Sequence, residues 1–277
     1  MKRLWLITNH ASGSAGTEKC AAIEAIFAER GLALAGRTFF PDEALPDGAA
    51  LDAATVDTVI LFAGDGTINA AACKLDAWGG SALILPGGTM NMLAKRLHGD
   101  ADPAAIVHAA HESRSSIKLP YVEAGPHRAF VAMIAGPATT WARAREIVRG
   151  GQISRLWRAL RLAWARSWRD GVSVFDGTRL RSRCNAVIVM PAADGCLKIS
   201  AVAAERWGEV ARLGWDYVTG DWHDAPAVDD SRSGRATIRG RPAIHALFDG
   251  EEAKLASPAT IRAGISELSF VTTVGAA

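Results

Sequence analysis

Long apolar stretches and an excess of charge of one sign are both missing from this sequence. The longest uncharged window, residues 77–94, contains five glycine and proline residues, whereas a membrane-spanning helix needs about 20 predominantly apolar residues. Lys and Arg total 31 and Asp and Glu total 29, which gives a formal net charge of +2. We therefore expect a protein that does not span a membrane, and the balanced charge argues against a uniformly basic protein that binds nucleic acid.

Cysteine is scarce, and internal repeats and low-complexity tracts are absent. The four cysteines, Cys20, Cys73, Cys184 and Cys196, follow no metal-ligand spacing, so neither a disulfide scaffold nor a zinc motif is expected. The apolar start of the chain ends at Asn9 after about five residues, which fits a buried strand better than a signal peptide. These features favour a cytoplasmic protein with reduced thiols.

The chain is long enough for two globular domains, with 277 residues of which 49% are hydrophobic and 22% charged. Residues 1–118 alternate β-rich runs with helical patterns, which predicts a parallel α/β domain with strands at 4–8, 58–62 and 82–85 and helices at 17–30 and 92–97. Residues 119–259 predict a second, mainly antiparallel domain, a β-sandwich. The last strand, about residues 260–277, is a candidate to return to the first domain.

The second domain is expected to be rich in short strands. They are predicted at 121–124, 129–135, 172–175, 185–190, 197–202, 236–239, 243–248 and 267–272. Two helical interruptions are predicted at 141–168 and 205–218, and a polar loop at 224–234. The fold class is therefore α/β plus β.

Three loops that directly follow predicted strands carry residues suited to binding phosphate. A phosphate needs converging backbone N–H donors, which glycine-rich turns at helix N-termini supply together with the favourable end of the helix dipole. Asp65 is suited to contact a metal or a nucleotide, and Thr67 and Asn69 can donate hydrogen bonds or cap a helix. A tight turn capped by Thr67 is the alternative for one loop alone, but loops after parallel strands would face one cleft. The candidate residues are Asn9, Ser12 and Gly13; Gly64, Asp65, Gly66, Thr67 and Asn69; and Gly87, Gly88, Thr89 and Asn91.

The order and spacing of these loops resemble the diacylglycerol kinase catalytic-domain family of lipid kinases, which includes bacterial diacylglycerol kinase-like proteins and the sphingosine and ceramide kinases. Residues 9–13 resemble the family's N-P-x-S-G, residues 63–70 its G-G-D-G-T-x-N-E and residues 86–92 its P-x-G-T-x-N-D. Residues 249–251 are similar to its late D-G-E, and residues 191–197 to a shortened P-x-A-x-x-D-G-x-L segment. The resemblance covers nearly the whole chain.

The resemblance implies that the three loops bind ATP and Mg²⁺ and that a lipid hydroxyl accepts the phosphoryl group. Asp249 would be the general base. Glu251 would project to the same side if the segment is extended, and would support Asp249 or bind Mg²⁺. Asp194 resembles the aspartate of a separate Mg²⁺ site completed by the carbonyls of Pro191 and Cys196. Ordinary turns are the alternative in both places, a solvent-exposed hairpin turn at Asp249 and an Asp-Gly turn at Asp194.

Two carboxylates of the family pattern are missing from this chain. Ala70 stands where the family has Glu, and Met92 where it has Asp. Mg²⁺ would therefore depend more on Asp65, Asp249, Glu251 and the nucleotide phosphates. The departures imply an altered substrate preference or a weakened kinase.

Positive charge is concentrated in one segment of the chain. Residues 141–183 contain eleven arginines and three acidic residues, a local charge of +8. As a helix, residues 153–169 would place a tryptophan-containing stripe opposite an arginine face. Such a helix suits the surface of an anionic membrane, at about 1 kcal/mol per arginine, and a helix packed on the β domain is an equal alternative. The stripe is Ile153, Trp157, Leu160, Trp164 and Trp168, and the arginines are Arg155, Arg158, Arg166 and Arg169.

Three functions follow from these observations, in order of preference. The first is an ATP-dependent lipid kinase that phosphorylates the primary hydroxyl of diacylglycerol or of a ceramide or sphingoid lipid, at the inner face of the membrane. The second is a kinase of a soluble acceptor, because the NAD kinases share a Gly-Gly-Asp-Gly-Thr core. The third is a nucleotide- or lipid-binding module with weak or no catalysis, which Ala70 and Met92 motivate.

Overall fold

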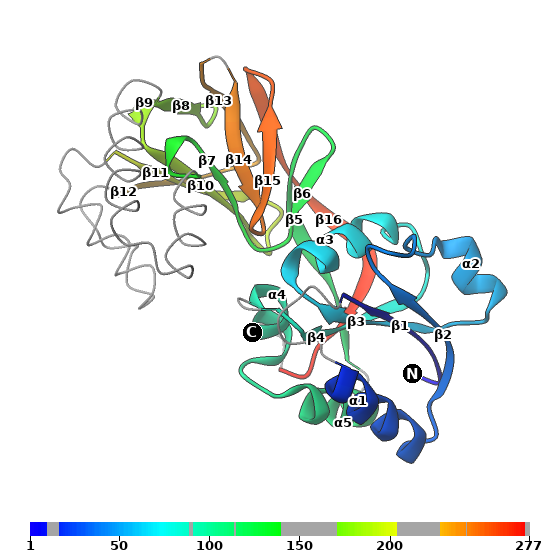
Figure 1. Cartoon of the computed structure of the whole chain (residues 1–277). Coiled ribbons are helices and arrows are strands. Elements are labelled where there is room, and N and C mark those ends of the chain that lie inside the picture. Colours follow the sequence, from blue (N-terminus) through cyan, green and yellow to red (C-terminus); the bar gives the residue numbers. More distant parts are fainter. Residues whose placement is uncertain are drawn as a thin grey trace, which may run out of the picture. The chain divides into compact units, whose positions relative to one another are not determined.

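The chain forms two compact units in the computed structural model, which describes residues 1–9, 17–88, 91–113, 115–139, 171–203, 228–241 and 243–274 (Figure 1). Unit 1 comprises Met1–Leu119 and Ile265–Ala277, and unit 2 comprises Pro120–Gly264. Strand β16 (Ala259–Val271) contributes residues to both units. The predicted fold class is confirmed, because unit 1 is α/β with a parallel sheet and unit 2 is built from antiparallel strands.

Unit 1 is organised around four parallel strands in the order β2-β1-β3-β4, with the last part of β16 beside β4. The strands are β1 (Arg3–Thr8), β2 (Ala33–Phe39), β3 (Thr58–Ala63) and β4 (Ser81–Pro86). All six residues of β3 are buried, as expected for a central parallel strand that is covered on both faces. Phe62 of β3 is in register with Thr8 of β1 and with Leu85 of β4, so the three strands end at the same edge.

The helices of unit 1 cover both faces of this sheet. They are α1 (Thr17–Glu29), α2 (Gly48–Ala53), α3 (Asp65–Lys74), α4 (Met92–His98) and α5 (Pro103–Ser113). Figure 1 shows α1 and α5 together on one face and α3 on the other. Phe27 of α1 and Val107 of α5 join one buried apolar cluster with Leu6 and Phe62 of the sheet. None of the helices in the described part of the chain has the length and apolarity needed to cross a bilayer.

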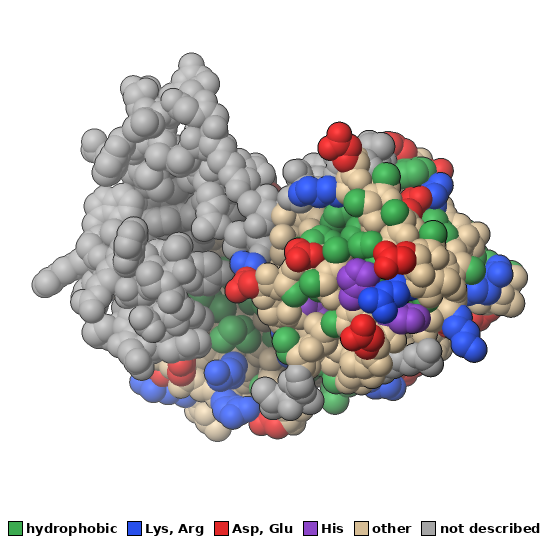
Figure 2. Space-filling view, turned by 90° about the horizontal axis from the view of Figure 1, so that it is seen from below, with side chains coloured by type: hydrophobic (Ala, Val, Ile, Leu, Met, Phe, Trp, Pro, Cys, Tyr) green, Lys and Arg blue, Asp and Glu red, His purple; other side chains and the backbone are tan. Residues whose placement is uncertain are grey.

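The outer surface of unit 1 over α1 and α5 carries mixed charge. Figure 2 shows this side, with acidic, basic and histidine side chains interspersed. Arg30 donates a hydrogen bond to Nδ1 of His108 at 3.0 Å and pairs with Glu112 at 3.5 Å. Within the described residues no group of three or more His, Cys, Asp or Glu side chains is arranged to hold a metal ion.

Unit 2 contains antiparallel strands of two sheets. One is the six-stranded sheet with the order β12-β11-β10-β7-β14-β15, and the other strands, the first part of β16 with β13, β8, β9, β5 and β6, belong to the same ten-stranded sheet as the parallel strands of unit 1. The bounds are β5 (Ser116–Ala124), β6 (His127–Ala129), β7 (Met133–Ala135), β8 (Val172–Phe175), β9 (Leu180–Cys184), β10 (Ala186–Pro191), β11 (Leu197–Val202), β12 (Val228–Ser233), β13 (Arg235–Arg239), β14 (Ile244–Phe248) and β15 (Glu251–Leu255), with a short 3-10 turn at Pro137–Thr139. Buried residues of both sheets, among them Val174, Val189 and Ile261, form one apolar core. This arrangement places the sheets face to face, as in a sandwich.

Three strand predictions need correction. The apolar run 129–135 is not one strand, because the chain bends at residues 130–132 between β6 and β7. The segment 224–234, predicted as a loop, contains strand β12, which pairs with β11 along its whole length. The run 267–272 is only the last part of a strand, β16, that begins at Ala259, close to the start at about 260 also predicted for the last strand. The predicted helices 141–168 and 205–218 lie outside the described residues.

Candidate active site

The three predicted phosphate loops follow β1, β3 and β4, which are neighbours in the parallel sheet. Asn9 follows β1, Gly64 follows β3 and Gly87 follows β4. Because parallel strands place their carboxyl ends at one edge, the loops converge there, which is where ligands bind in open α/β sheets. Ser12, Gly13 and Thr89 lie outside the described residues, and the other loop residues are all described.

The loops after β3 and β4 are in direct backbone contact. A Cβ atom added at Gly87 would lie 2.6 Å from the backbone nitrogen of Ala63, and one added at Gly88 would lie 2.7 Å from Cα of Gly64. Neither position leaves room for a side chain, since the opposing atoms are backbone and cannot swing aside. The glycines are therefore needed to bring the two loops together, and Gly64 can approach Gly88 so closely because it also lacks a side chain.

Side-chain hydrogen bonds fix the conformation of these loops. Nδ2 of Asn9 donates to Oγ1 of Thr67 at 2.9 Å, which joins the first loop to the second. Oδ1 of Asn91 accepts from the backbone N–H of Gly88 at 2.7 Å, and its Nδ2 donates to the Gly88 carbonyl at 3.0 Å. Asn91 adopts a left-handed conformation with φ of 51°, which asparagine tolerates better than most residues. The three loops are thus one connected structure.

Helix α3 directs its N-terminus toward this edge of the sheet. Gly64 is its N-cap and Asp65 lies in its first turn, where the dipole of the helix favours negative charge. Thr67 is buried, and Asn69 faces Cys73 one turn later, with Sγ 3.5 Å from Oδ1. The first N–H groups of a helix have no partner within the helix, so this end offers donors to an anion. Ala70 lies in the next part of the helix.

Helix α4 follows the third loop, begins at Met92 and ends at His98, whose side chain is buried. Nδ1 of His98 lies 3.0 Å from Oγ1 of Thr273, near the end of the chain. Burial lowers the pKa of His98 from its usual 6.5 to about 4. The imidazole is therefore neutral near pH 7 and anchors the helix without adding charge to the loops.

Asp249 in unit 2 is held by three backbone amides. Its carboxylate accepts hydrogen bonds from the N–H groups of Phe130 at 2.7 Å, Val131 at 2.9 Å and Ala132 at 3.0 Å, while its own N–H donates to the Ala132 carbonyl at 3.0 Å. These amides are those of the bend between β6 and β7. Although Asp249 lies in a turn, only 7% of it is exposed.

The backbone around Asp249 is not extended, which corrects the assumption that Asp249 and Glu251 project to the same side. Asp249 and Gly250 have positive φ values of 49° and 95° and form a two-residue turn between β14 and β15. Left-handed residues at both central positions are typical of such hairpin turns, for which Asp-Gly is a favoured pair. Glu251 is the first residue of β15, in register with Phe248, and its side chain is exposed.

Asp194, the predicted ligand of a separate metal, is engaged by an arginine. Its Oδ2 accepts a hydrogen bond from Arg232 of β12 at 2.8 Å, and its Oδ1 accepts from the N–H of Cys196 at 3.1 Å. These two partners, the Cys196 amide foremost, hold the pKa of Asp194 below its ordinary value. Gly195 has φ of 76° and the loop closes through the Ala192 and Cys196 backbone. A guanidinium therefore engages the carboxylate that a metal ion would need.

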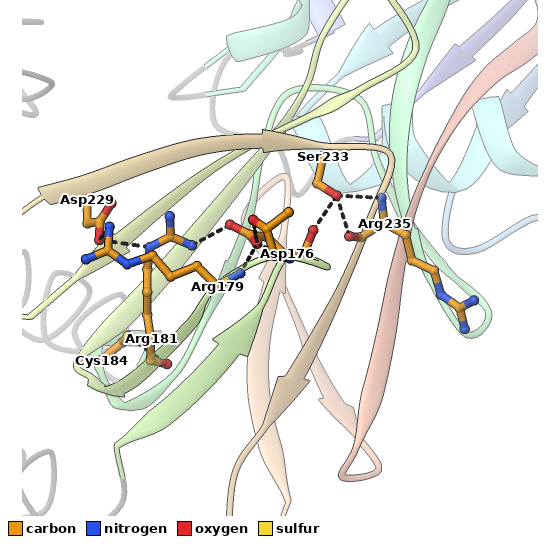
Figure 3. Close-up of polar contacts among 8 residues, drawn as sticks. Asp176, Arg179, Arg181, Cys184, Asp229, Ser233 and Arg235 are labelled. Atoms are coloured by element: carbon orange, nitrogen blue, oxygen red, sulfur yellow. Dashed lines mark hydrogen bonds and ion pairs between the residues drawn. The ribbon is translucent and has the colours of Figure 1, made fainter.

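A buried ion-pair network that the sequence analysis did not identify lies at the turn between β8 and β9 (Figure 3). Oδ1 of Asp176 accepts from Thr178 and from the Arg179 backbone, and Oδ2 accepts from Arg181 at 2.7 Å. Arg181 also lies 3.0 Å from Asp229. Burial on its own raises the pKa of Asp176, but the hydrogen bonds from Arg179, Arg181 and Thr178 outweigh burial and lower its pKa below the ordinary value.

This network has the character of a structural feature rather than a reactive one. Asp176 and Arg181 are almost fully buried and satisfy one another. Two of the arginines counted in the basic segment 141–183, Arg179 and Arg181, are thus paired with Asp229 and Asp176. No local sequence signal identifies Asp229 as their partner, because it lies about 50 residues further along the chain.

The comparisons with known proteins agree with this geometry. Residues 3–120 match the model of the diacylglycerol kinase catalytic domain. The whole chain is similar in structure to a diacylglycerol kinase from Bacillus anthracis, with 14% identity, a TM-score of 0.65 and coverage of 98% of this chain and 97% of that one. A candidate diacylglycerol kinase from the same organism aligns with 17% identity and a TM-score of 0.70, covering 98% of this chain and 95% of that one.

No curated protein sequence matches the chain. The structural similarity, at such low identity, establishes the fold, and the domain match establishes the kind of catalytic domain. The matched residues 3–120 include all three loops described above. Residues 3–120 therefore match the diacylglycerol kinase catalytic domain, and this match supports a kinase that acts on a lipid or another alcohol.

Proposed function

We propose that the protein transfers the γ-phosphoryl group of ATP to the primary hydroxyl of a membrane lipid, either diacylglycerol or a ceramide or sphingoid lipid. The observation that carries the proposal is the joining of three loops at one sheet edge, through the Asn9–Thr67 hydrogen bond and the contact of Gly88 with Gly64. Phosphoryl transfer depends mainly on positioning and on electrostatic stabilisation of phosphate oxygens. A rigid, glycine-lined edge beside a helix N-terminus meets both needs.

The residues of unit 1 fit an ATP phosphate chain. Gly87 and Gly88 let the loop after β4 pack directly against the loop after β3, and the first turn of α3 provides N–H donors. Thr67 is held in place by Asn9, so its position is set before the nucleotide arrives. Preorganised donors of this kind lose little conformational entropy when the ligand binds.

Mg²⁺ would be held at this edge by Asp65 together with the nucleotide phosphates. Mg²⁺ prefers oxygen ligands and is commonly bound through one or two carboxylates plus substrate phosphates, so the absence of carboxylates at Ala70 and Met92 does not exclude it. When bound, Mg²⁺ neutralises charge on the transferring phosphoryl group. Glu251 is proposed as the second carboxylate. Asp194 does not fit the role, because Arg232 already binds its carboxylate.

Asp249 is proposed to orient the lipid hydroxyl and accept its proton. The three amides of residues 130–132 fix the Asp249 carboxylate before the lipid binds. A fixed acceptor is what positioning catalysis requires, since small displacements of a catalytic group have large effects on rate.

The test is a lipid kinase assay with a matched pair of glycine variants. Purified protein is incubated with labelled ATP and mixed micelles of each lipid, and labelled phospholipid is measured. Gly88→Ala pushes the loops apart and should lower ATP binding and turnover by about 100-fold. Gly79→Ala is the control, because a Cβ at Gly79 meets nothing within 4 Å. Equal activity of the two variants, or no labelled lipid from the parent protein, would contradict the proposal.

A binding module with little catalysis is a second candidate, which the missing carboxylates at positions 70 and 92 favour. Restoring them with Ala70→Glu and Met92→Asp should create lipid phosphorylation where the parent has none. Robust turnover by the parent would exclude this candidate. Activity on NAD without activity on lipids would instead identify a kinase of a soluble acceptor.

We further propose that the protein works in the cytoplasm at the inner face of the membrane. The proposed docking surface is the arginine face of residues 153–169, which lie outside the described part of the chain. Replacing Arg155, Arg158, Arg166 and Arg169 by Gln should weaken binding to anionic vesicles and leave binding to neutral vesicles unchanged. Unchanged binding to anionic vesicles would remove this surface from the proposal.

A further inference from the structure

Unit 2 contains a cavity that the proposed kinase reaction does not use. Its volume is about 590 Å³, and its walls are the turn between β5 and β6 and the turn between β15 and β16. Such a volume lies within the range of small-molecule sites, about 300–1,000 Å³. The cavity belongs to unit 2 alone, since its lining residues all fall within 123–262.

The inner wall of the cavity is apolar and the accessible part is basic. Ala124, Leu255 and Ala259 are buried lining residues, whereas Lys254 and Arg262 are exposed lining residues. Buried lining residues form the floor, and exposed ones form the rim. A ligand that fits would therefore carry its anionic group at the rim and a small organic body inside.

The positive charge of the rim is not cancelled by neighbouring acids. The acidic lining residue Glu123 accepts a hydrogen bond from Arg128 at 3.1 Å, and that guanidinium lies over the ring of Tyr121 at 4.3 Å. Neither Lys254 nor Arg262 forms an ion pair with any residue that the structure describes. Two uncompensated cations therefore line the same cavity.

This charge matches one class of ligand. A phosphate monoester carries between about −1.5 and −2 near pH 7, whereas a carboxylate or a phosphodiester carries only −1. Two cations of the lysine and arginine type are balanced by the monoester, whereas a monoanion would leave one positive charge uncompensated. His127, which also lines the cavity, adds a ring N–H donor for a phosphate oxygen.

The walls are held in place without a ligand. The β5–β6 hairpin pairs Val122 with Ala129 and Ala124 with His127, and the ring of His127 lies against that of Phe248 with centroids 5.3 Å apart. The opposite wall continues from β15, which is paired with β14 over its full length. The site is therefore largely preformed, which lowers the entropic cost of binding.

We propose that this cavity binds a phosphate monoester with a small organic body, independently of the kinase reaction. The shared chemistry is the dianionic phosphate, which can come from a soluble phosphorylated compound or from the headgroup of a lipid phosphate. The proposal does not depend on the proposed function, because it requires neither ATP nor the loops of unit 1.

The experiment measures binding of two probes by the full-length protein. Glycerol 3-phosphate is titrated by calorimetry, and vesicles containing phosphatidic acid in neutral lipid are tested by flotation. The variant Lys254→Gln with Arg262→Gln should weaken binding of at least one probe by about tenfold or more, since it removes two charge-assisted contacts. The matched control is Arg239→Gln, an exposed arginine of β13 outside the cavity lining, and should bind like the parent.

The two probes separate the sources of the phosphate. Loss of glycerol 3-phosphate binding supports a soluble ligand, and loss of vesicle binding alone supports a lipid headgroup. Ala256→Trp provides a second test, because it fills the cavity from an exposed lining position and leaves both charges in place. The proposal is overturned if the parent binds neither probe, or if the double variant and Ala256→Trp bind both as the parent does.

Discussion

The hydrogen bonds to Asp249 predict that its removal will destabilise the protein before any effect on catalysis is considered. Asp249→Ala deletes the acceptor of three backbone N–H groups, those of Phe130, Val131 and Ala132, at 2.7, 2.9 and 3.0 Å. A hydrogen bond to a charged group contributes about 1.5 kcal/mol or more. The expected loss from the three bonds is therefore at least about 4.5 kcal/mol in the free energy of unfolding, a large share of the roughly 5–15 kcal/mol typical of a domain.

Asp249→Asn provides the matched variant. It keeps the size of the side chain and tolerates the left-handed φ of 49°, and its amide oxygen can still accept from two of the three N–H groups. The amide NH₂ would then face the third, so we expect a loss of about 1–3 kcal/mol. Glu251→Ala serves as the control, since Glu251 is exposed and surface substitutions usually change stability by less than about 0.5 kcal/mol.

Urea unfolding of the four proteins checks this order. The unfolding midpoint should fall from the parent and Glu251→Ala, through Asp249→Asn, to Asp249→Ala, at an unchanged slope. An Asp249→Ala midpoint equal to that of the parent would refute the reasoning. The order also decides how a kinase assay is interpreted, because lost turnover identifies a proton acceptor only in a variant that is still folded under the assay conditions.

Three further predictions concern other buried or paired groups. Burial lowers the pKa of His98 from 6.5 to about 4, so the unfolded protein takes up a proton at this histidine before the folded protein does. The free energy of unfolding should therefore fall by about 3 kcal/mol as the pH drops from 6.5 to 4. His98→Gln should reduce this dependence on pH, which urea unfolding at each pH measures. Asp176→Asn breaks the buried pair with Arg181 and should cost about 3–5 kcal/mol near neutral pH; because the pKa of Asp176 is lowered in the fold, the difference from the parent should shrink below about pH 4. In Arg232→Ala the Asp194 carboxylate loses its guanidinium partner, so added Mg²⁺ should raise the melting temperature of this variant more than that of the parent; equal shifts would show that the arginine does not stand in for a cation.

The sequence was sufficient to predict three of the four parallel strands, β1, β3 and β4, with the loops that follow them, because each is encoded locally, whereas β2 was not predicted. The β-rich run 58–62 is bounded by turn residues, and glycines follow it directly. Buried parallel strands are apolar throughout, and such runs followed by glycine and a helical pattern have few other interpretations. The fold class and the convergence of the loops follow from that pattern.

Features that depend on distant partners could not be predicted in the same way. Residues 129–135 are all apolar, so nothing in the run marks the bend at 130–132; the bend is stabilised by Asp249, which lies more than 100 residues away. The positive φ values at Asp249 and Gly250 could have been predicted, because Asp-Gly between two strand-like segments is a turn signal. Strand β12 was missed because its polar residues lie on an edge strand, where apolar alternation is weak.

Strand β16 sets a limit on how this chain can be divided. The segment that matches the catalytic domain ends at residue 120, yet Ser269 and Phe270 of β16 pair with β4, which carries one of the phosphate loops. A fragment of residues 1–120 would leave that side of β4 as an open edge, and an exposed apolar edge strand promotes aggregation. The segment recognisable as a catalytic domain is therefore shorter than the segment that the domain needs in order to fold. Insertions or truncations near the C-terminus should weaken nucleotide binding, although they lie far in sequence from the loops proposed to bind the nucleotide.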